Sequence, residues 1–279
     1  MSTTTGFNPL VLSKFLLWAI AVAAATWLLR RGRITPRRRL AFLFLGVLVF
    51  GFAYGFLVPA NPNPVLALRG VLAGLLAGRT LVPLIALMLV VLLLMSFVSN
   101  KSICGWGCQL GLLQDLLYRI PAPKWRPPFW LTNSVRVAAT LGLVVGLAWA
   151  GADWIKGVDP FGIFSLKVGI GVGAVAGLVL LLSLFVYRPW CRFLCPFGLV
   201  SWAVEQVSLM RPRIVREKCV GCRACVRACP TGAMGDFIEG KRIHADCFAC
   251  GACLGACSRE GALSWAGPWE AKKGVTDEV

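Results

Sequence analysis

Eight of the twelve cysteines lie between Cys219 and Cys257, in two runs with the same spacing, C-x2-C-x2-C-x3-C. Three thiolates so close together in sequence can hold one [4Fe–4S] cluster, and the fourth cysteine of each run is placed for the other cluster. The spacing therefore predicts two cross-ligated clusters. The first would be held by Cys219, Cys222, Cys225 and Cys257, and the second by Cys247, Cys250, Cys253 and Cys229.

Two other roles for such cysteines are less favoured. Zinc sites pair two C-x2-C knuckles across a longer loop, often with histidine, and do not interleave cysteine triplets. A disulfide framework is typical of small secreted chains, and this chain of 279 residues is not of that kind. Pro230 follows Cys229, whereas Ser258 follows Cys257. Because the proline shapes a turn and is no ligand, we expect cluster binding to survive its loss.

The composition places most of the chain in a bilayer. Hydrophobic residues make up 58% of it and the mean hydropathy is +0.75, which is typical of membrane proteins. The net charge of +17 comes from Lys and Arg gathered at the ends of apolar runs, a pattern that orients membrane proteins and does not indicate nucleic-acid binding. The single histidine, His244, lies among the cysteine runs, so no apolar helix carries an axial haem ligand. A cytochrome b type of quinol site is therefore excluded.

The fold class expected is a mainly α membrane protein with a bundle of about five transmembrane helices and a small α+β cluster-binding domain. The expected spans are residues 10–29, 40–57, 81–98, 135–152 and 168–187. A basic cluster follows the first span instead of preceding it, which argues against a signal peptide and puts the N-terminus outside. The first span is the least certain of the five.

Basic residues after the fifth span keep the cysteine runs in the cytoplasm. The expected domains are a transmembrane domain (1–210), a cytoplasmic 2[4Fe–4S] ferredoxin domain (211–265) and a tail (266–279). The expected location is a bacterial inner (plasma) membrane, with several passes through it.

The remaining four cysteines form two C-x3-C pairs, Cys104 with Cys108 and Cys191 with Cys195. Gly-Leu follows each pair at the same offset, so the second and third spans and the fourth and fifth spans read as two copies of one repeat. Both copies run the same way, and we expect the pairs to meet at the cytoplasmic face. Four thiolates there could form an additional iron–sulfur centre or act as redox dithiols. Equally, they could be small buried residues where helices approach closely.

With these motifs together, residues 38–265 resemble the NapH/MauN family of membrane-bound ferredoxin-type proteins, related to NosR/CcoG-type polyferredoxins. The resemblance implies four helices before two cytoplasmic [4Fe–4S] clusters, and electron transfer from quinol toward a periplasmic redox enzyme with a partner ferredoxin. MauN-type members belong to methylamine dehydrogenase systems. Two features depart from the family pattern. Gln109 stands where proline usually follows the first pair, and the first span exceeds the four-helix pattern.

The leading functional hypothesis is a relay of electrons between the quinol pool and a redox partner, as a NapH-like quinol dehydrogenase component. Its partners would be membrane lipid and a soluble ferredoxin-type or cytochrome/oxidoreductase subunit. Basic residues near the clusters would attract an acidic partner, and Asp115 and Asp159 are candidate proton acceptors from quinol. The alternative is an accessory protein that matures or reactivates a periplasmic redox enzyme, in the manner of MauN or NosR. A redox sensor would usually carry an output domain, and none is seen.

Overall fold

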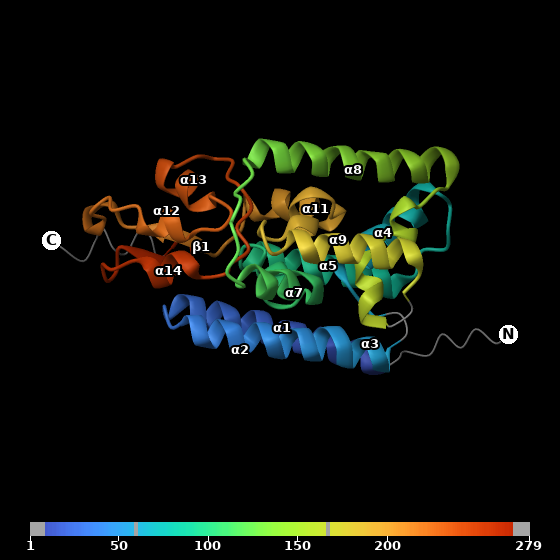
Figure 1. The fold of residues 1–279 in the computed structure, drawn as a ribbon, viewed down its shortest axis with the longest axis horizontal. Coiled ribbons are helices and arrows are strands. Elements are labelled where there is room, and N and C mark those ends of the chain that lie inside the picture. The colour runs from blue at the N-terminus through green and yellow to red at the C-terminus, as the bar shows by residue number, and fades with distance from the viewer. Residues whose placement is uncertain (1–8, 59–60, 166–167, 270–279) are drawn as a thin grey trace.

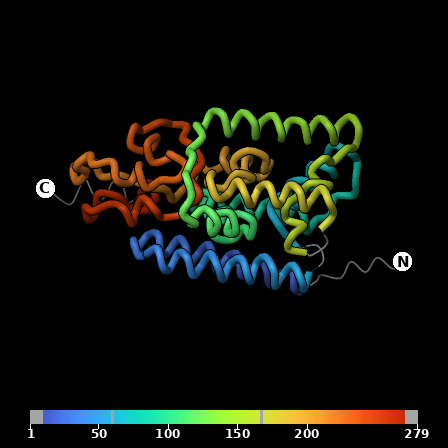
Figure 2. The backbone as a smooth tube through the Cα atoms, in the orientation of Figure 1, coloured from blue at the N-terminus to red at the C-terminus, as the bar shows by residue number. Residues whose placement is uncertain are grey.

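The computed structural model describes residues 9–58, 61–165 and 168–269. Most of the described chain is helical, and long helices run back and forth along the long axis of the molecule (Figure 1). The tube in Figure 2 shows the C-terminal part, in orange and red, at one end of this axis. The cysteine-rich part is thus placed at one end of a helical bundle.

The first two long helices form one edge of the bundle. Helix α1 (Pro9–Arg30) is formed by the first apolar run of the sequence. The second, Pro36–Leu57, is continuous but divided by a π-helical turn into α2 (Pro36–Gly46), Val47–Ala53 and α3 (Tyr54–Leu57). Thr35 caps its start by accepting a hydrogen bond from the Arg38 N–H at 3.3 Å, and Pro36 occupies the first helical position, as expected for a helix N-terminus.

The remaining longer helices are α4 (Pro64–Leu76), α5 (Pro83–Val98), α8 (Phe129–Ala150) and α9 (Ile170–Leu182). Among the described residues, three helices are long and apolar enough to cross a membrane: Leu10–Arg30, Pro36–Leu57 and Phe129–Ala150. Helices α5 and α9, expected as the third and fifth spans, are apolar but shorter, at 16 and 13 residues. Short 3₁₀ turns at Trp154–Gly157 and Pro160–Ser165 separate α8 from α9.

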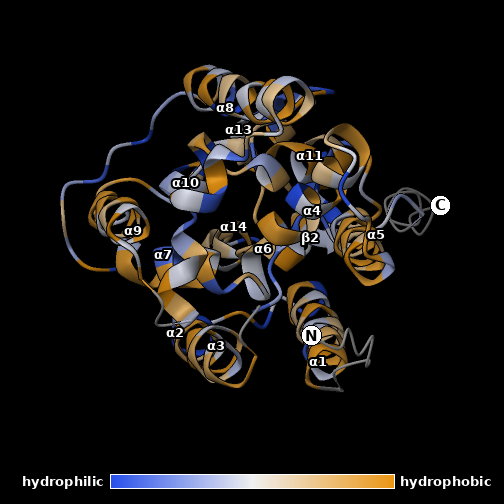
Figure 3. Cartoon of the chain, turned by 90° about the vertical axis from the view of Figure 1, so that its right-hand side faces the viewer, coloured by the Kyte–Doolittle hydropathy of each residue, from blue (hydrophilic) through white to orange (hydrophobic). Residues whose placement is uncertain are grey.

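Four short helices lie inside this frame: α6 (Ser102–Trp106), α7 (Gln109–Tyr118), α10 (Pro189–Phe193) and α11 (Pro196–Glu205). The view along the bundle shows α6 near the centre, with α1, α2, α5, α8 and α9 around it (Figure 3). Helices α7 and α11 both bury residues in the core, including Leu112 and Phe197, which are 0% and 1% exposed.

The C-terminal part is built on a two-stranded antiparallel sheet. Strand β1 (Arg211–Ile214) pairs with β2 (Leu263–Ala266), with Arg211 opposite Ala266. Between them lie a 3₁₀ turn (Arg216–Lys218) and the helices α12 (Ala224–Ala228), α13 (Ala233–Glu239) and α14 (Ala252–Ala256). The sheet closes the cysteine-rich segment by joining its beginning to its end.

The outer faces of the long helices expose large apolar side chains. Examples are Phe56 at 77%, Trp130 at 69% and Trp149 at 89% exposure. Soluble monomers rarely expose so much contiguous apolar surface, whereas lipid-facing helices do. The orange outer faces in Figure 3 show the same pattern.

Candidate iron–sulfur centres

The first set of predicted cluster ligands surrounds one cavity. Cys219, Cys222, Cys225 and Cys257 all line a cavity of about 270 Å³. Two left-handed residues, Gly221 (φ 71°) and Arg223 (φ 54°), turn the chain around this cavity. Cys257 comes from the second cysteine run and joins the first three across the contact between α12 and α14. The structure thus brings together the four residues that the spacing grouped.

The second set of predicted ligands surrounds another cavity. Cys229, Cys247, Cys250 and Cys253 line a tighter space of about 20 Å³. Gly251 (φ 77°) and Ala249 (φ 50°) supply left-handed turns here. Cys229 belongs to the first run and reaches the second set, so the exchange of the fourth cysteine is reciprocal.

The four thiols around each cavity match the donor set of a cubane cluster and not that of a single metal ion. No group of three or more His, Cys, Asp or Glu in the described part of the chain is drawn together closely enough to hold one ion. Each cavity instead spreads four thiols around its wall, which is the donor set of a [4Fe–4S] cluster. Burial raises the pKa of the Cys247, Cys250 and Cys253 thiols. Iron must therefore displace protons from this second set.

The two sets differ in their distance from the bundle. Cys219 and Cys222 are exposed. The segment around Cys247, in contrast, is hydrogen-bonded to the bundle: its N–H donates to Glu205 Oε1 at 3.1 Å and its carbonyl accepts from Asn100 Nδ2 at 3.4 Å. Trp106 Nε1 donates to the Ala249 carbonyl at 2.8 Å. The second set therefore lies against the bundle and the first lies at the outer end.

A buried charge cluster fixes this contact. The Asp246 carboxylate is paired with Lys101, and with Arg136 Nη1 at 2.9 Å, and all three side chains are 1% exposed or less. Burial alone would raise the pKa of Asp246, but the two cations outweigh it and hold that pKa well below its usual value. One carboxylate from the C-terminal part thus pairs with two cations from the bundle, and Glu205 Oε2 of α11 lies 3.9 Å from Lys101 Nζ.

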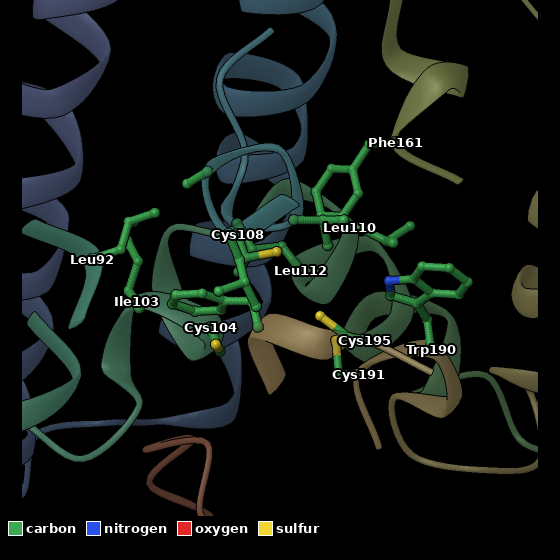
Figure 4. Close-up of a cluster of buried hydrophobic side chains, with 14 of the residues drawn as sticks. Leu92, Ile103, Cys104, Cys108, Leu110, Leu112, Phe161, Trp190, Cys191 and Cys195 are labelled. Atoms are coloured by element: carbon green, nitrogen blue, oxygen red, sulfur yellow. The ribbon is translucent and has the colours of Figure 1, made fainter. Parts of the chain in front are cut away.

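The four remaining cysteines are buried inside the bundle. Cys104, Cys108, Cys191 and Cys195 are 5–6% exposed and belong to the hydrophobic core. Figure 4 shows the side chains of Cys108 and Cys195 reaching toward one another, with Cys104 and Cys191 nearby, and electrostatic interactions link the four thiols. The structure thus brings the two pairs together, and they meet within the hydrophobic core.

The two C-x3-C turns have matching backbones. Lys101 and Arg188, three residues before the first cysteine of each pair, both adopt left-handed conformations, with φ of 54° and 51°. Cys108 and Cys195 each precede a ten-residue helix, with φ of −73° and −69°. At Gly111 a Cβ atom would lie 2.8 Å from the Cys104 carbonyl oxygen, and at Gly198 it would lie 2.5 Å from that of Cys191.

Asp115, considered from the sequence as a proton acceptor, is engaged in a buried network. Its Oδ2 accepts from Arg39 Nη2 at 2.8 Å, Arg188 Nη2 at 3.0 Å and the Tyr187 hydroxyl at 3.2 Å. These partners lie 72 to 76 residues away, and no local pattern points to them. Asp159, the other candidate, lies 3.7 Å from Arg69 Nη1, in the loop between α8 and α9.

Replacing Gly105 by alanine should loosen the contact between the C-terminal part and the bundle. A Cβ there would lie 2.0 Å from the Phe248 carbonyl oxygen, closer than any van der Waals contact. We expect a cost of about 1–3 kcal/mol, seen as a lower melting midpoint in detergent. Gly142→Ala is the control, since nothing lies within 4 Å of its added Cβ. An unchanged midpoint for Gly105→Ala would contradict the contact.

Comparison with protein families finds similarity to 4Fe–4S binding domains in both parts of the chain. A family described as "4Fe-4S binding domain" (Fer4) matches residues 212–234, and a second family of the same description (Fer4_5) matches residues 81–128 and 168–214. The chain is a membrane protein with 4Fe–4S binding domains. The two Fer4_5 matches each contain one of the C-x3-C pairs. The C-terminal part is called the ferredoxin domain below.

Several curated proteins are similar to this chain. They include the uncharacterized protein MJ0749 of Methanocaldococcus jannaschii (27% identical; 63% of this chain, 68% of that protein). The putative electron transport protein YccM of Escherichia coli is 26% identical, over 61% of this chain and 52% of that protein. The regulatory protein NosR of Pseudomonas aeruginosa is 27% identical, over 50% of this chain and 22% of that protein. The match therefore spans about half of YccM and less of NosR. No solved structure matches.

Proposed function

We propose that this chain is a membrane-bound iron–sulfur electron-transfer protein that relays electrons between the quinol pool and a redox partner, as a NapH-like quinol dehydrogenase component. The observation that carries the proposal is the division of eight cysteines into two four-thiol cavities, one against the bundle and one at the outer end. The electron-transport description of YccM supports the same role.

The proposed ligands of the first cluster are Cys219, Cys222, Cys225 and Cys257, and those of the second are Cys247, Cys250, Cys253 and Cys229. Bound clusters would supply one-electron oxidation and reduction. The residues of the bundle hold the second set in place through Asp246 and Cys247, while the exposed thiols of the first set stay open to a partner.

The outer end of the ferredoxin domain is suited to an acidic partner. Arg223 lines the cavity of the exposed cysteines, Arg227 Nη1 donates to the Cys222 carbonyl at 3.0 Å, and Arg242 is exposed. Lys241 is balanced by Asp236 and Glu239 at 2.9 Å each. Arginines around a redox site steer an oppositely charged protein toward it. We propose a soluble ferredoxin-type or cytochrome/oxidoreductase subunit as this partner.

The proposed arrangement in the membrane is five passes, with the N-terminus outside and the ferredoxin domain in the cytoplasm. The basic residues at Arg30, Arg31 and Arg33 support it, because they follow α1 at the end of the bundle that carries the ferredoxin domain. The proposed domains are 1–210, 211–265 and a tail at 266–279. The matching C-x3-C turns support two repeats within the first domain.

The four buried thiols are proposed to form a further iron–sulfur centre within the bundle. Each pair ends at the N-terminus of a ten-residue helix, where backbone N–H groups stabilise a thiolate. Cys195 Sγ already accepts from the Gly198 N–H at 3.3 Å.

The double variant Cys104→Ser with Cys191→Ser tests this centre. Iron per chain should fall to about eight atoms, the content of two cubane clusters, because two of its four ligands are lost. Cys→Ser preserves size, so the fold should survive. Equal iron in the variant and the wild type would contradict ligation and leave the pairs as dithiols or packing residues.

The accessory role remains the second candidate, because it needs the same clusters. The observation that favours it is the similarity to the regulatory protein NosR. Quinol added to anaerobic membranes that contain the protein, followed by EPR spectroscopy, separates the two. Reduction of the clusters supports the relay. Clusters that dithionite reduces but quinol does not would sink direct quinol oxidation.

A further inference from the structure

A further cavity lies between the bundle and the ferredoxin domain, beside the second thiol set. Its volume is about 370 Å³, within the range of small-molecule sites. Its walls come from the start of α2, the end of α7, and the segment around α14. Its lining includes Arg39, Asp115, Tyr118, Tyr187, Cys250 and Ala252.

The cavity has polar groups whose hydrogen-bonding capacity is not used. Arg39 is 2% exposed, and its Nη2 donates to Asp115 Oδ2 at 2.8 Å, which holds the carboxylate in the cavity wall. Asp115 uses Oδ2 for three donors, whereas its Oδ1 has only a longer contact of 3.7 Å to Arg119 Nε. An acceptor in the wall that has no close donor suits a ligand that brings a hydroxyl group.

The rest of the lining is flat and carbon-rich. Tyr118 and Tyr187 pack edge-on with ring centroids 5.2 Å apart. Gly251, Ala252 and Gly255 also line the cavity and contribute little or no side chain to it. This combination fits a planar aromatic ring with oxygen at its edge. A phosphate group fits less well, because the Asp115 carboxylate lines the same cavity and repels an anion.

The cavity lies at the end of the bundle where α2 begins. Pro36 and Thr35 line it, directly after the basic residues that mark the membrane surface. Cys250, a proposed ligand of the second cluster, forms part of the same wall. A ring in this cavity would therefore lie next to the set of thiols that is closest to the bundle.

We propose that this cavity binds the headgroup of quinol, with the ring against Tyr118 and Tyr187 and with Asp115 Oδ1 accepting from a ring hydroxyl. The proposal rests on the proposed quinol relay and gives it a site. Oxidation of one quinol to quinone releases two electrons and two protons. Clusters bound at the proposed cysteine sets would accept the electrons one at a time, and the protons pass to water at the mouth of the cavity.

The test uses the full chain in nanodiscs and an azidoquinone that labels its site on illumination. Labelled peptides are mapped by mass spectrometry. We expect labelling within residues 34–39, 115–119 or 251–256, and at least a tenfold loss of labelling in Tyr118→Trp, which fills the cavity. Tyr118→Phe should weaken labelling several-fold if the hydroxyl contacts the ring. The matched controls, Ile120→Trp outside the cavity and Tyr54→Phe at the far end of the bundle, should label as the wild type does.

Cluster reduction by quinol, measured in parallel, separates this proposal from the relay itself. Wild-type reduction by quinol that persists in Tyr118→Trp, or labelling elsewhere, overturns the cavity and leaves the relay standing. Labelling at the cavity without any reduction by quinol supports the site and overturns the relay. Displacement of the label by anionic phospholipid, but not by unlabelled quinone, would show a lipid site and overturn the proposal.

Discussion

Combining Cys222→Ala with Cys257→Ala is expected to remove one cluster, whereas Cys222→Ala with Cys229→Ala is expected to remove both. The reason is cross-ligation, since Cys257 lines the cavity of Cys222 and Cys229 lines the cavity of Cys250. The first pair should lower iron by about four atoms per chain and the second by about eight. Iron analysis and EPR of the dithionite-reduced protein measure this difference.

The opposite result would identify the alternative connectivity. If each run held its own cluster, the double variant Cys222→Ala with Cys257→Ala would lose both clusters. The double variant Cys222→Ala with Cys229→Ala would lose only one. The single variant Cys250→Ala serves as a reference for loss of the cluster nearer the bundle. Its EPR spectrum should match that of Cys229→Ala and differ from that of Cys257→Ala.

Asp246→Asn is expected to detach the ferredoxin domain from the bundle. The change removes the carboxylate that neutralises Lys101 and Arg136, which are both 0% exposed. Breaking a buried ion pair from one side costs about 3–5 kcal/mol, because the remaining charge stays buried without a partner. The melting midpoint in detergent should fall, and a protease should cut the connection between α11 and β1 faster.

Glu239→Gln is the matched control, since it removes one carboxylate from a surface pair with Lys241 at 2.9 Å. Exposed ion pairs contribute little to stability, so this variant should have the same melting midpoint as the wild type. Iron content must be measured for both, because Asp246 precedes Cys247. An Asp246→Asn protein that keeps the wild-type midpoint and protease resistance would show that the charge cluster does not hold the domains together.

The grouping of the eight ferredoxin cysteines followed from spacing alone. Three cysteines so close in sequence can place their thiols around only one cluster. In proteins with this spacing, the fourth cysteine of each run binds the other cluster. The structure places Cys219 with Cys257 and Cys229 with Cys247 around separate cavities, as the spacing grouped them. The spacing within each run was sufficient to group the cysteines, because it limits which thiols can lie around the same cavity.

The position of the C-x3-C pairs could not be predicted in the same way. Basic residues beside them suggested a cytoplasmic face, but Lys101 and Arg188 are buried and neutralised by Asp246 and Asp115. These carboxylates lie 145 and 73 residues away in sequence. A rule that counts charges near apolar runs treats such residues as surface signals. Only the tertiary pairings show that they hold α6 and α10 inside the core.

The most direct test of the account is the metal content and EPR spectrum of the full chain, purified without oxygen. The account predicts at least about eight iron atoms per chain, little zinc, and signals from two reduced [4Fe–4S] clusters that interact magnetically. Stoichiometric zinc with no iron, or iron that gives no [4Fe–4S] signal after reduction, would contradict it.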